Sequence, residues 1–452
     1  MPELGSYPAS VARGFQDLAR RARALATRWG LPVLVWASGM REPSRSEWAL
    51  HARGWVWRKP SAGVSVWAAG CAWEVRLHGP ARFLDAASAW GRLAAGAVAE
   101  GPVRPVAFAA FAFQTGSTTG PWKSFPDGLL TVPRVLRVRV GWREYLALGC
   151  VVGPEEDGEV EHTLQVVDSA REAPAELSGE ARLVRCAPEE DRWEQAVKEA
   201  EAACRAGHLH KVVVARCVEA AACASADRVL HHLSTRYPTC TTFAVCVQGA
   251  VFLGATPETL VRVRGGHVRT QALAGTAPRG RGAEQDEAFR YRLRSSPKEA
   301  REHHLVLTHL QQVLRPLCTT LRTGHQTVVR LANVQHLRTT LTGQLREPRA
   351  LLELAGHLHP TPATAGMPVQ AALDWIRARE PVARGWYAGA VGWVDPAGGE
   401  LAVALRCALL RDGRAWAFAG CGIVAGSDPQ REWEESQLKL RPVMEALGMA
   451  WP

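Results

Sequence analysis

Between residues 31 and 152 the sequence is a succession of short apolar runs separated by turns, and this spacing restricts the possible fold more than any other feature. Runs bounded by glycine, proline and small polar residues predict strands that pair as antiparallel hairpins. They lie at 31–37, 54–57, 64–67, 73–77, 106–113, 129–140 and 146–152. Two helices are expected nearby, one over 15–29 that ends at Gly30 and one over 81–99.

From Pro188 onward helical and strand patterns alternate. Helices are predicted over 188–207, 226–236, 284–317 with an interruption near Ser296-Pro297, 368–379 and 429–447, and strands over 211–218, 241–247, 251–260, 267–273, 327–331, 389–394, 401–410 and 415–423. The polar, acidic stretch 154–179 is expected to be a loop between a β-rich N-terminal half, 1–180, and a C-terminal region, 181–452. The predicted fold class is α+β, with large antiparallel sheets flanked by outer helices.

The balance of charged residues indicates which class of binding partner the protein favours. Basic residues outnumber acidic ones by 54 to 44, and the net charge of +10 favours anionic partners. No basic run interleaved with aromatic residues is present, so no nucleic acid is expected. The sequence has no membrane-spanning apolar run and no targeting-peptide pattern, and its eleven cysteines have neither disulfide nor metal-ligand spacing. These features predict a cytoplasmic protein with reduced thiols.

Lysine is rare in this chain, which makes each lysine a candidate for acid–base chemistry. The six lysines are Lys59, Lys123, Lys198, Lys211, Lys298 and Lys439. A desolvated lysine can lose its proton, whereas arginine cannot. Lys211 begins an apolar strand, where burial would lower its pKa and free an amine base; a strand-end lysine extending to solvent is the alternative. Glu258 follows a buried strand and would be a general acid if its pKa is raised, or simply a turn residue.

Two acidic helix segments are candidates for a metal site. The three-residue spacing puts Glu299 with Glu302 on one helix face and Glu432 with Glu435 on another. Two such faces opposite each other would supply the oxygen ligands that Mg²⁺ prefers, although each alone is typical of an exposed salt-bridged helix. Further features suit a carboxylate, because glycine lets main-chain N–H groups approach an anion and arginine binds it bidentately. They are Ala274-Gly275-Thr276, Arg406 in a predicted strand, Gly420-Cys421-Gly422 and Lys439.

Taken in order, these segments resemble the chorismate-utilising enzymes. The resemblance covers most of the chain and is densest after Lys211, in KVVVAR, FLGATPETL, ALAGT, KEAREHHLV, NVQHL, HPTPATAG, RGWYAGAVGW, LRCALL and GCGIVAGSDPQREWEESQLK. FAAFAFQTG and PWKSFPDGLLTVPRVL carry a looser match in the N-terminal half. The resemblance implies the fold of the chorismate-binding and anthranilate synthase component I enzymes, with 181–452 as the chorismate-binding catalytic region.

Family members add ammonia or water to chorismate, and three positions favour water. Lys211 stands where the water-using branches carry their base, Ala274 stands where aminodeoxychorismate synthases carry a nucleophilic lysine, and HPTPA at 359–363 is similar to the isochorismate and salicylate synthase pattern. Glu299 stands where aspartate is commoner, and Thr364 where valine is usual. The resemblance implies a menaquinone-type isochorismate synthase. The alternatives are a siderophore-pathway isochorismate synthase, a salicylate synthase, and a non-catalytic anion binder on this fold.

The resemblance also implies a role for each candidate residue. Lys211 would activate water for attack at C2, and Glu258 would protonate the departing C4 hydroxyl. Mg²⁺ would be held by Glu302 and Glu435, with Glu299 and Glu432 next to it. Chorismate would be bound by Gly275, Thr276, His336, Tyr387, Arg406, Gly422 and Lys439. No amidotransferase subunit is expected, because ammonia is not the nucleophile.

Overall fold

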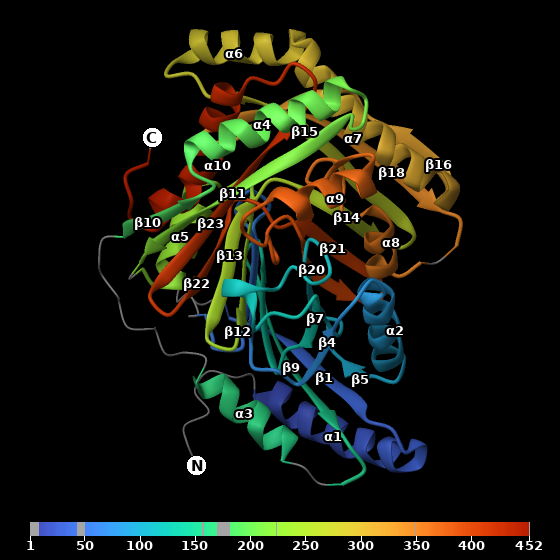
Figure 1. Cartoon of the computed structure of the whole chain (residues 1–452). Coiled ribbons are helices and arrows are strands. Elements are labelled where there is room, and N and C mark those ends of the chain that lie inside the picture. The colour runs from blue at the N-terminus through green and yellow to red at the C-terminus, as the bar shows by residue number, and fades with distance from the viewer. Residues whose placement is uncertain are drawn as a thin grey trace.

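The computed structural model describes residues 9–42, 50–155, 158–169, 181–222, 224–347 and 349–451. Two large sheets pack around a common apolar core, and helices cover their outer sides (Figure 1). All described strand pairs are antiparallel except β1 with β5. The predicted α+β class with large antiparallel sheets is confirmed.

The larger sheet has 13 strands, and its edge strands are β10 and β5. In spatial order they are β10 (Arg182–Ala187), β11 (Lys211–Ala221), β23 (Arg414–Ile423), β22 (Cys407–Arg411), β13 (Ala250–Thr256), β12 (Thr241–Val247), β2 (Trp55–Lys59), β3 (Val64–Ala69), β8 (Val135–Val140), β9 (Arg143–Val152), β1 (Val33–Arg41) and β5 (Val98–Glu100), with β19 (Gly366–Met367) beside β11. The central strands are buried along nearly their whole length, as their apolar sequences predict.

The second sheet has 10 strands. In spatial order they are β16 (Cys318–Thr323), β18 (Val334–Leu345), β15 (His267–Pro278), β14 (Thr259–Arg264), β21 (Gly398–Val403), β20 (Ala390–Asp395), β6 (Ala107–Phe111), β7 (Gly128–Val132) and β4 (Trp73–Leu77), with β17 (Thr327–Arg330) beside β18. Early and late parts of the chain meet in both sheets, since Trp57 pairs with Phe243 and Phe108 with Trp393.

The helices divide between the outer sides of the two sheets. They are α1 (Ala9–Trp29), α2 (Arg82–Ala95), α3 (Glu159–Ser169), α4 (Glu190–Arg205), α5 (Ala226–Arg236), α6 (Ala283–Ser295), α7 (Pro297–Leu314), α8 (Leu351–Leu358), α9 (Val369–Arg379) and α10 (Pro429–Ala446). Helices α1, α3, α5 and α10 enclose a second apolar core against the larger sheet, whereas α7 and α8 lie on the second sheet. No helix of the described residues is both long and apolar enough to cross a membrane.

The chain crosses between the sheets twice close to the same place. It leaves β13 in the larger sheet and enters β14 in the second sheet through Pro257 and Glu258. It returns between β21 and β22, where Arg406 has a φ of +48°. At these crossings the chain leaves the strand conformation, so side chains do not alternate between the two faces of a sheet. Residues of both crossings line the candidate site.

Several sequence predictions need correction. The stretch 154–179 is not simply a loop, because α3 lies within it; residues 156–157 and 170–179 are outside the described residues. The predicted strands 129–140, 251–260 and 401–410 are each two strands in different sheets, because an apolar run continues through the crossing. Arg406 therefore lies between strands and not in one. Strands β5, β10, β16, β18 and β19 and helices α3 and α8 were not predicted, and the predicted helix 81–99 ends at Ala95. The ten described cysteines are free thiols, as expected.

Candidate active site

A small cavity lies where the two sheet crossings meet Glu302 of α7 and Lys439 of α10. Its walls come from β11 and β23 of the larger sheet, from β15 and β18 of the second sheet, and from residues 363–364. Of the thirteen candidate residues, those that line it are Glu258, Gly275, Thr276, Glu302, His336, Tyr387, Arg406, Gly422 and Lys439. The other four, Lys211, Glu299, Glu432 and Glu435, contact or lie beside these residues.

Lys211 is the first residue of β11 and its side chain is fully buried. The amine Nζ lies 2.8 Å from Glu302 Oε1, but it makes no hydrogen bond with the described residues. Gly422 on the neighbouring strand β23 makes room for this arrangement, because a Cβ there would lie 2.7 Å from Lys211 Cε. The lysine is therefore not a strand-end residue that extends to solvent.

Glu258 lies in the crossing between β13 and β14 and is 4% exposed. Burial raises the pKa of its carboxyl group to about 7, against the opposing effect of the positive charges of Lys211, Arg406 and Lys439. A carboxyl group with this pKa keeps a substantial protonated fraction near neutral pH, which suits a general acid. The same cavity thus holds a carboxylic acid and a buried amine.

His336 and Arg406 form a hydrogen-bonded unit in the cavity wall. Burial, together with the charges of Arg406 and Lys439, lowers the pKa of His336 to about 3, so the imidazole is neutral. Its Nδ1 is 3.0 Å from the Gly275 carbonyl and acts as the donor, which leaves Nε2 to accept from Arg406 Nη2 at 3.1 Å. Arg406 Nε has no hydrogen-bond partner among the described residues. The guanidinium is thereby oriented and retains a donor for an anion.

Two glycines shape one side of the cavity. Gly275 has a φ of +80° at a bulge of β15, and the next N–H group, that of Thr276, donates to Glu299 Oε2 at 3.0 Å. Lys439 Nζ donates to the Gly420 carbonyl at 2.9 Å. A Cβ at Gly420 would lie 2.9 Å from the hydroxyl of Tyr387, a residue whose pKa burial raises. Side chains larger than glycine would fill this space.

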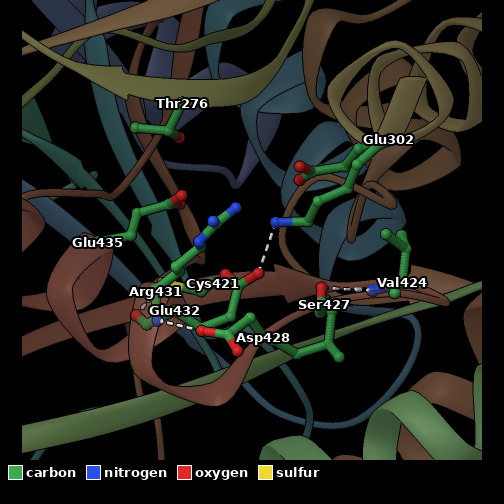
Figure 2. Close-up of polar contacts among 12 residues, drawn as sticks. Thr276, Glu302, Cys421, Val424, Ser427, Asp428, Arg431, Glu432 and Glu435 are labelled. Atoms are coloured by element: carbon green, nitrogen blue, oxygen red, sulfur yellow. Dashed lines mark hydrogen bonds and ion pairs between the residues drawn. The ribbon is translucent and has the colours of Figure 1, made fainter. Parts of the chain in front are cut away.

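Helices α7 and α10 begin at fixed positions, and this aligns their acidic first turns. Pro297 starts α7, where Ser296 Oγ accepts the N–H of Glu299 at 3.3 Å. A proline also starts α10, where Asp428 accepts the N–H of Arg431 at 3.0 Å (Figure 2). Proline at the first helical position and an oxygen-bearing cap are strong helix-start signals. The interruption predicted near Ser296-Pro297 is this boundary.

The four glutamates of these helices face one another across a common space. Figure 2 shows Glu302, Glu432 and Glu435 directed toward it from two helices. Burial and the Glu302 charge raise the pKa of Glu299 to about 7, and burial and the Glu435 charge raise that of Glu432 to about 7. Burial also acts on Glu435, but Lys439 and Lys298 reverse it and lower the pKa of Glu435 to about 2. The carboxylates are therefore close enough to repel.

This donor set fits a magnesium ion. Mg²⁺ prefers carboxylate oxygens, and mutual repulsion among buried carboxylates is relieved by a divalent cation. Cys421 lies within reach as well, since its Sγ is within 4.8 Å of the ligand oxygens of Glu432 and Glu435. Its thiol is buried and its pKa is raised well above the usual value, so the neutral sulfur is a poor partner for a hard cation.

Three residues near the site were not identified as site residues from the sequence. Lys298 Nζ lies 2.5 Å from Glu432 Oε1 and 3.5 Å from Glu299 Oε1, so it joins the two helices. The sequence feature that could have identified Lys298 as a site residue is that lysine is rare in this chain. Arg384 and Glu380 form an ion pair, and no sequence spacing distinguished them from an exposed helix-end pair.

The Arg384–Glu380 pair connects residues 363–364 of the cavity wall to β11, the strand that begins with Lys211. Arg384 Nη1 donates to the Thr364 carbonyl at 2.7 Å, and Nη2 donates to the Val213 carbonyl at 2.8 Å. Glu380 Oε1 accepts the N–H of Ala215 at 3.0 Å. Arg384 is 2% exposed and Glu380 7%. The pair thus positions the β11 backbone and residues 363–364 together without lining the cavity.

Comparison with known proteins identifies related chains. A model of the family described as "Chorismate binding enzyme" matches residues 46–448. The salicylate biosynthesis isochorismate synthase of Pseudomonas aeruginosa is 37% identical over 403 residues, covering 87% of this chain and 84% of the relative. Isochorismate synthase MenF of Bacillus subtilis is 34% identical over 354 residues, covering 76% and 75%. The solved structure of menaquinone-specific MenF from Escherichia coli has a TM-score of 0.75 at 24% identity over 96% of this chain and all of that one, which shows a shared fold.

Proposed function

Because the chain belongs to the chorismate-binding enzyme family, we propose that it is an isochorismate synthase, an isomerase that converts chorismate to isochorismate. The relatives at 37% and 34% identity carry that name. The observation that carries the proposal is the pairing of a fully buried amine, Lys211, with a buried carboxyl group, Glu258, whose pKa is about 7. A protein that only bound anions would have no need of this pair.

In the proposed reaction, Lys211 and Glu258 carry out the two proton transfers. Lys211 takes a proton from water as the oxygen bonds to C2 of chorismate. Both ring double bonds shift by one position, the C4–oxygen bond breaks, and the departing hydroxyl takes the Glu258 proton and leaves as water. One water is consumed and one is released, so atoms balance, and Lys211 and Glu258 return to their starting states by exchange with solvent. An amine base and a raised-pKa acid in one cavity are typical of such paired transfers.

The cavity wall suits a dianionic substrate. Arg406 and Lys439 supply positive charge, and neutral His336 fixes the guanidinium of Arg406. Tyr387, Thr276 and the main chain near Gly275 and Gly422 border the same space. Arginine binds carboxylates bidentately, which orients the ring as well as attracting it.

We further propose Mg²⁺ as the cofactor, held by Glu302 and Glu435 with Glu299 and Glu432 next to them. When bound, the ion would offset the charge of a substrate carboxylate. Glu299 joins α7 to β15 by accepting the N–H of Thr276, and Glu435 pairs with Lys439 on its own helix.

We also propose that the product feeds menaquinone biosynthesis and that no amidotransferase subunit is needed. The MenF relative supports the first point. Alanine at position 274 and the buried Lys211 favour water over ammonia as nucleophile. Deleting the gene in the source organism and measuring quinones tests the pathway: loss of menaquinone supports it, and a normal menaquinone content contradicts it.

Incubation of the purified chain with chorismate and Mg²⁺, followed by chromatography, tests the function. We expect isochorismate that is absent when EDTA is added and unchanged in amount when ammonium is added. Lys211→Ala should bind chorismate but not convert it. Salicylate with pyruvate would instead identify the second candidate, a salicylate synthase that uses the same residues, which HPTPA at 359–363 also favours. No EDTA-sensitive turnover would contradict both.

A further inference from the structure

A second hollow shares one loop with the catalytic cavity. It is a cleft of about 550 Å³ bordered by α2, α8 and α9, which lie near one another in Figure 1. His359 and Pro360 line this cleft, whereas Ala363 and Thr364, a few residues further on, line the catalytic cavity. The loop 359–364 therefore borders both hollows.

Arg82, at the start of α2, lines this cleft and forms no ion pair with the residues that the structure describes. It is 7% exposed, and its Nη2 donates to the Ala112 carbonyl at 3.2 Å, while Nε has no hydrogen-bond partner among the described residues. The negative charge of Asp127 acts on Arg82 without a direct ion pair between the two residues, and the Asp127 carboxylate oxygens accept the N–H groups of Gly79 and Gly116, each at 3.0 Å. A buried charge normally has a partner, since desolvation alone is costly.

Part of the cleft wall is apolar and suits a compact apolar body, whereas the rest is polar, because Glu353, His357, Gln370 and Arg377 also line the cleft. Phe83, Phe113 and Leu373 contribute apolar walls, and the ring of Phe83 lies 5.0 Å from the Arg82 guanidinium carbon. Gln114 adds an amide, which donates to the Leu373 carbonyl at 3.3 Å. Small-molecule sites commonly combine apolar walls with a few fixed polar groups and have volumes of roughly 300–1,000 Å³. The cleft has this composition and size.

We propose that this cleft is a second ligand site, which binds a small carboxylate with a ring-sized apolar body, and that Arg82 is the residue that pairs with the carboxylate. The buried positive charge of Arg82 favours a carboxylate, and the apolar walls favour a ring attached to it. A bare inorganic anion would leave the apolar walls uncovered, and a neutral ring would leave Arg82 without a partner.

Occupation of the cleft affects the catalytic cavity through the shared loop. The His359 ring lies 5.5 Å from that of Phe83, and its Nε2 donates to the Phe113 carbonyl at 3.2 Å. Further along, the Thr364 carbonyl accepts the hydrogen bond from Arg384 that also fixes β11. A ligand against Phe83 and His359 thus shifts the turnover number rather than competing with chorismate. This effect rests on the proposed function, whereas binding does not.

Fluorine NMR with para-fluorobenzoate as the probe tests the binding directly on the full chain. We expect saturable broadening of the probe signal that persists in Arg406→Met and in the presence of chorismate. Arg82→Met should weaken binding about tenfold or more, since a charged hydrogen bond is lost. Arg92→Met, an exposed arginine on the same helix, should have no effect. Leu373→Trp, which fills the cleft and leaves the charge, should also abolish binding.

The outcomes separate this site from the catalytic one. Loss of broadening in Arg406→Met, or displacement of the probe by chorismate, would place the probe in the catalytic cavity and overturn the proposal. Unchanged binding in a folded Arg82→Met or Leu373→Trp variant, checked by circular dichroism, would overturn it as well. If the probe binds as predicted but chorismate is not converted, the second site stands and the proposed function fails.

Discussion

Replacing Gly422 by alanine should slow the reaction although it removes none of the proposed catalytic groups. A Cβ at this position would lie 2.7 Å from Lys211 Cε and closer still to Glu302 Oε1, whereas ordinary contact begins at 3.4 Å. Lys211 must therefore withdraw by roughly 0.7 Å and Glu302 by more. A displacement of about 1 Å at a reacting group costs on the order of 10²-fold in rate. We expect kcat to fall by about that factor.

Steady-state kinetics on chorismate, combined with thermal unfolding, measure this effect. The added methyl group should also cost about 1–3 kcal/mol of unfolding free energy, because the space around Gly422 is filled. Gly14→Ala on α1 is the matched control, since its Cβ would meet no atom within 4 Å. Wild-type kcat in a folded Gly422→Ala enzyme would refute the reasoning, because it would show that the close packing of Lys211 and Glu302 is not part of the reactive geometry.

Three further predictions follow from the site. Burial raises the pKa of Glu258 to about 7, so its acid form is lost and kcat should fall as the pH rises through about 7; Glu258→Gln should remove this limb of the pH profile and lower kcat by about 10²–10⁴-fold. Glu435→Gln should abolish Mg²⁺-dependent activity, whereas Glu434→Gln, at an exposed position of the same helix, should leave it intact, as read by metal titration. Arg384→Met should cost about 3–5 kcal/mol of unfolding free energy in guanidinium, and less when combined with Glu380→Met; a double variant that unfolds as easily as the single one contradicts the buried-pair account.

Several parts of the fold could be predicted because their signals are local. Apolar runs between turns identified most strands, and Ser296-Pro297 marked the start of α7. The spacing of Glu299 with Glu302 placed both on one helix face. That α7 and α10 bring these faces together is a property of tertiary packing, and only the family resemblance anticipated it.

The sheet crossings show why local patterns were insufficient. The runs 251–260 and 401–410 stay apolar across the point where the chain changes sheets, so periodicity alone predicts one strand each. Arg406 was consequently assigned to a strand. It lies instead at the crossing, where its φ is +48°, and its side chain lines the cavity. Arg384 and Glu380 are four residues apart, a spacing usual for exposed helix pairs, and their burial depends on contacts with β11.

Conversion of chorismate in water enriched with ¹⁸O tests the central claim most directly. If Lys211 activates a water molecule for attack at C2, the isochorismate should gain the mass of one heavy oxygen, and fragmentation should locate it at C2. Lys211→Ala should form no labelled product. Isochorismate without the heavy oxygen would contradict the account, because the hydroxyl would then have moved within the substrate and Lys211 would not be a base acting on water.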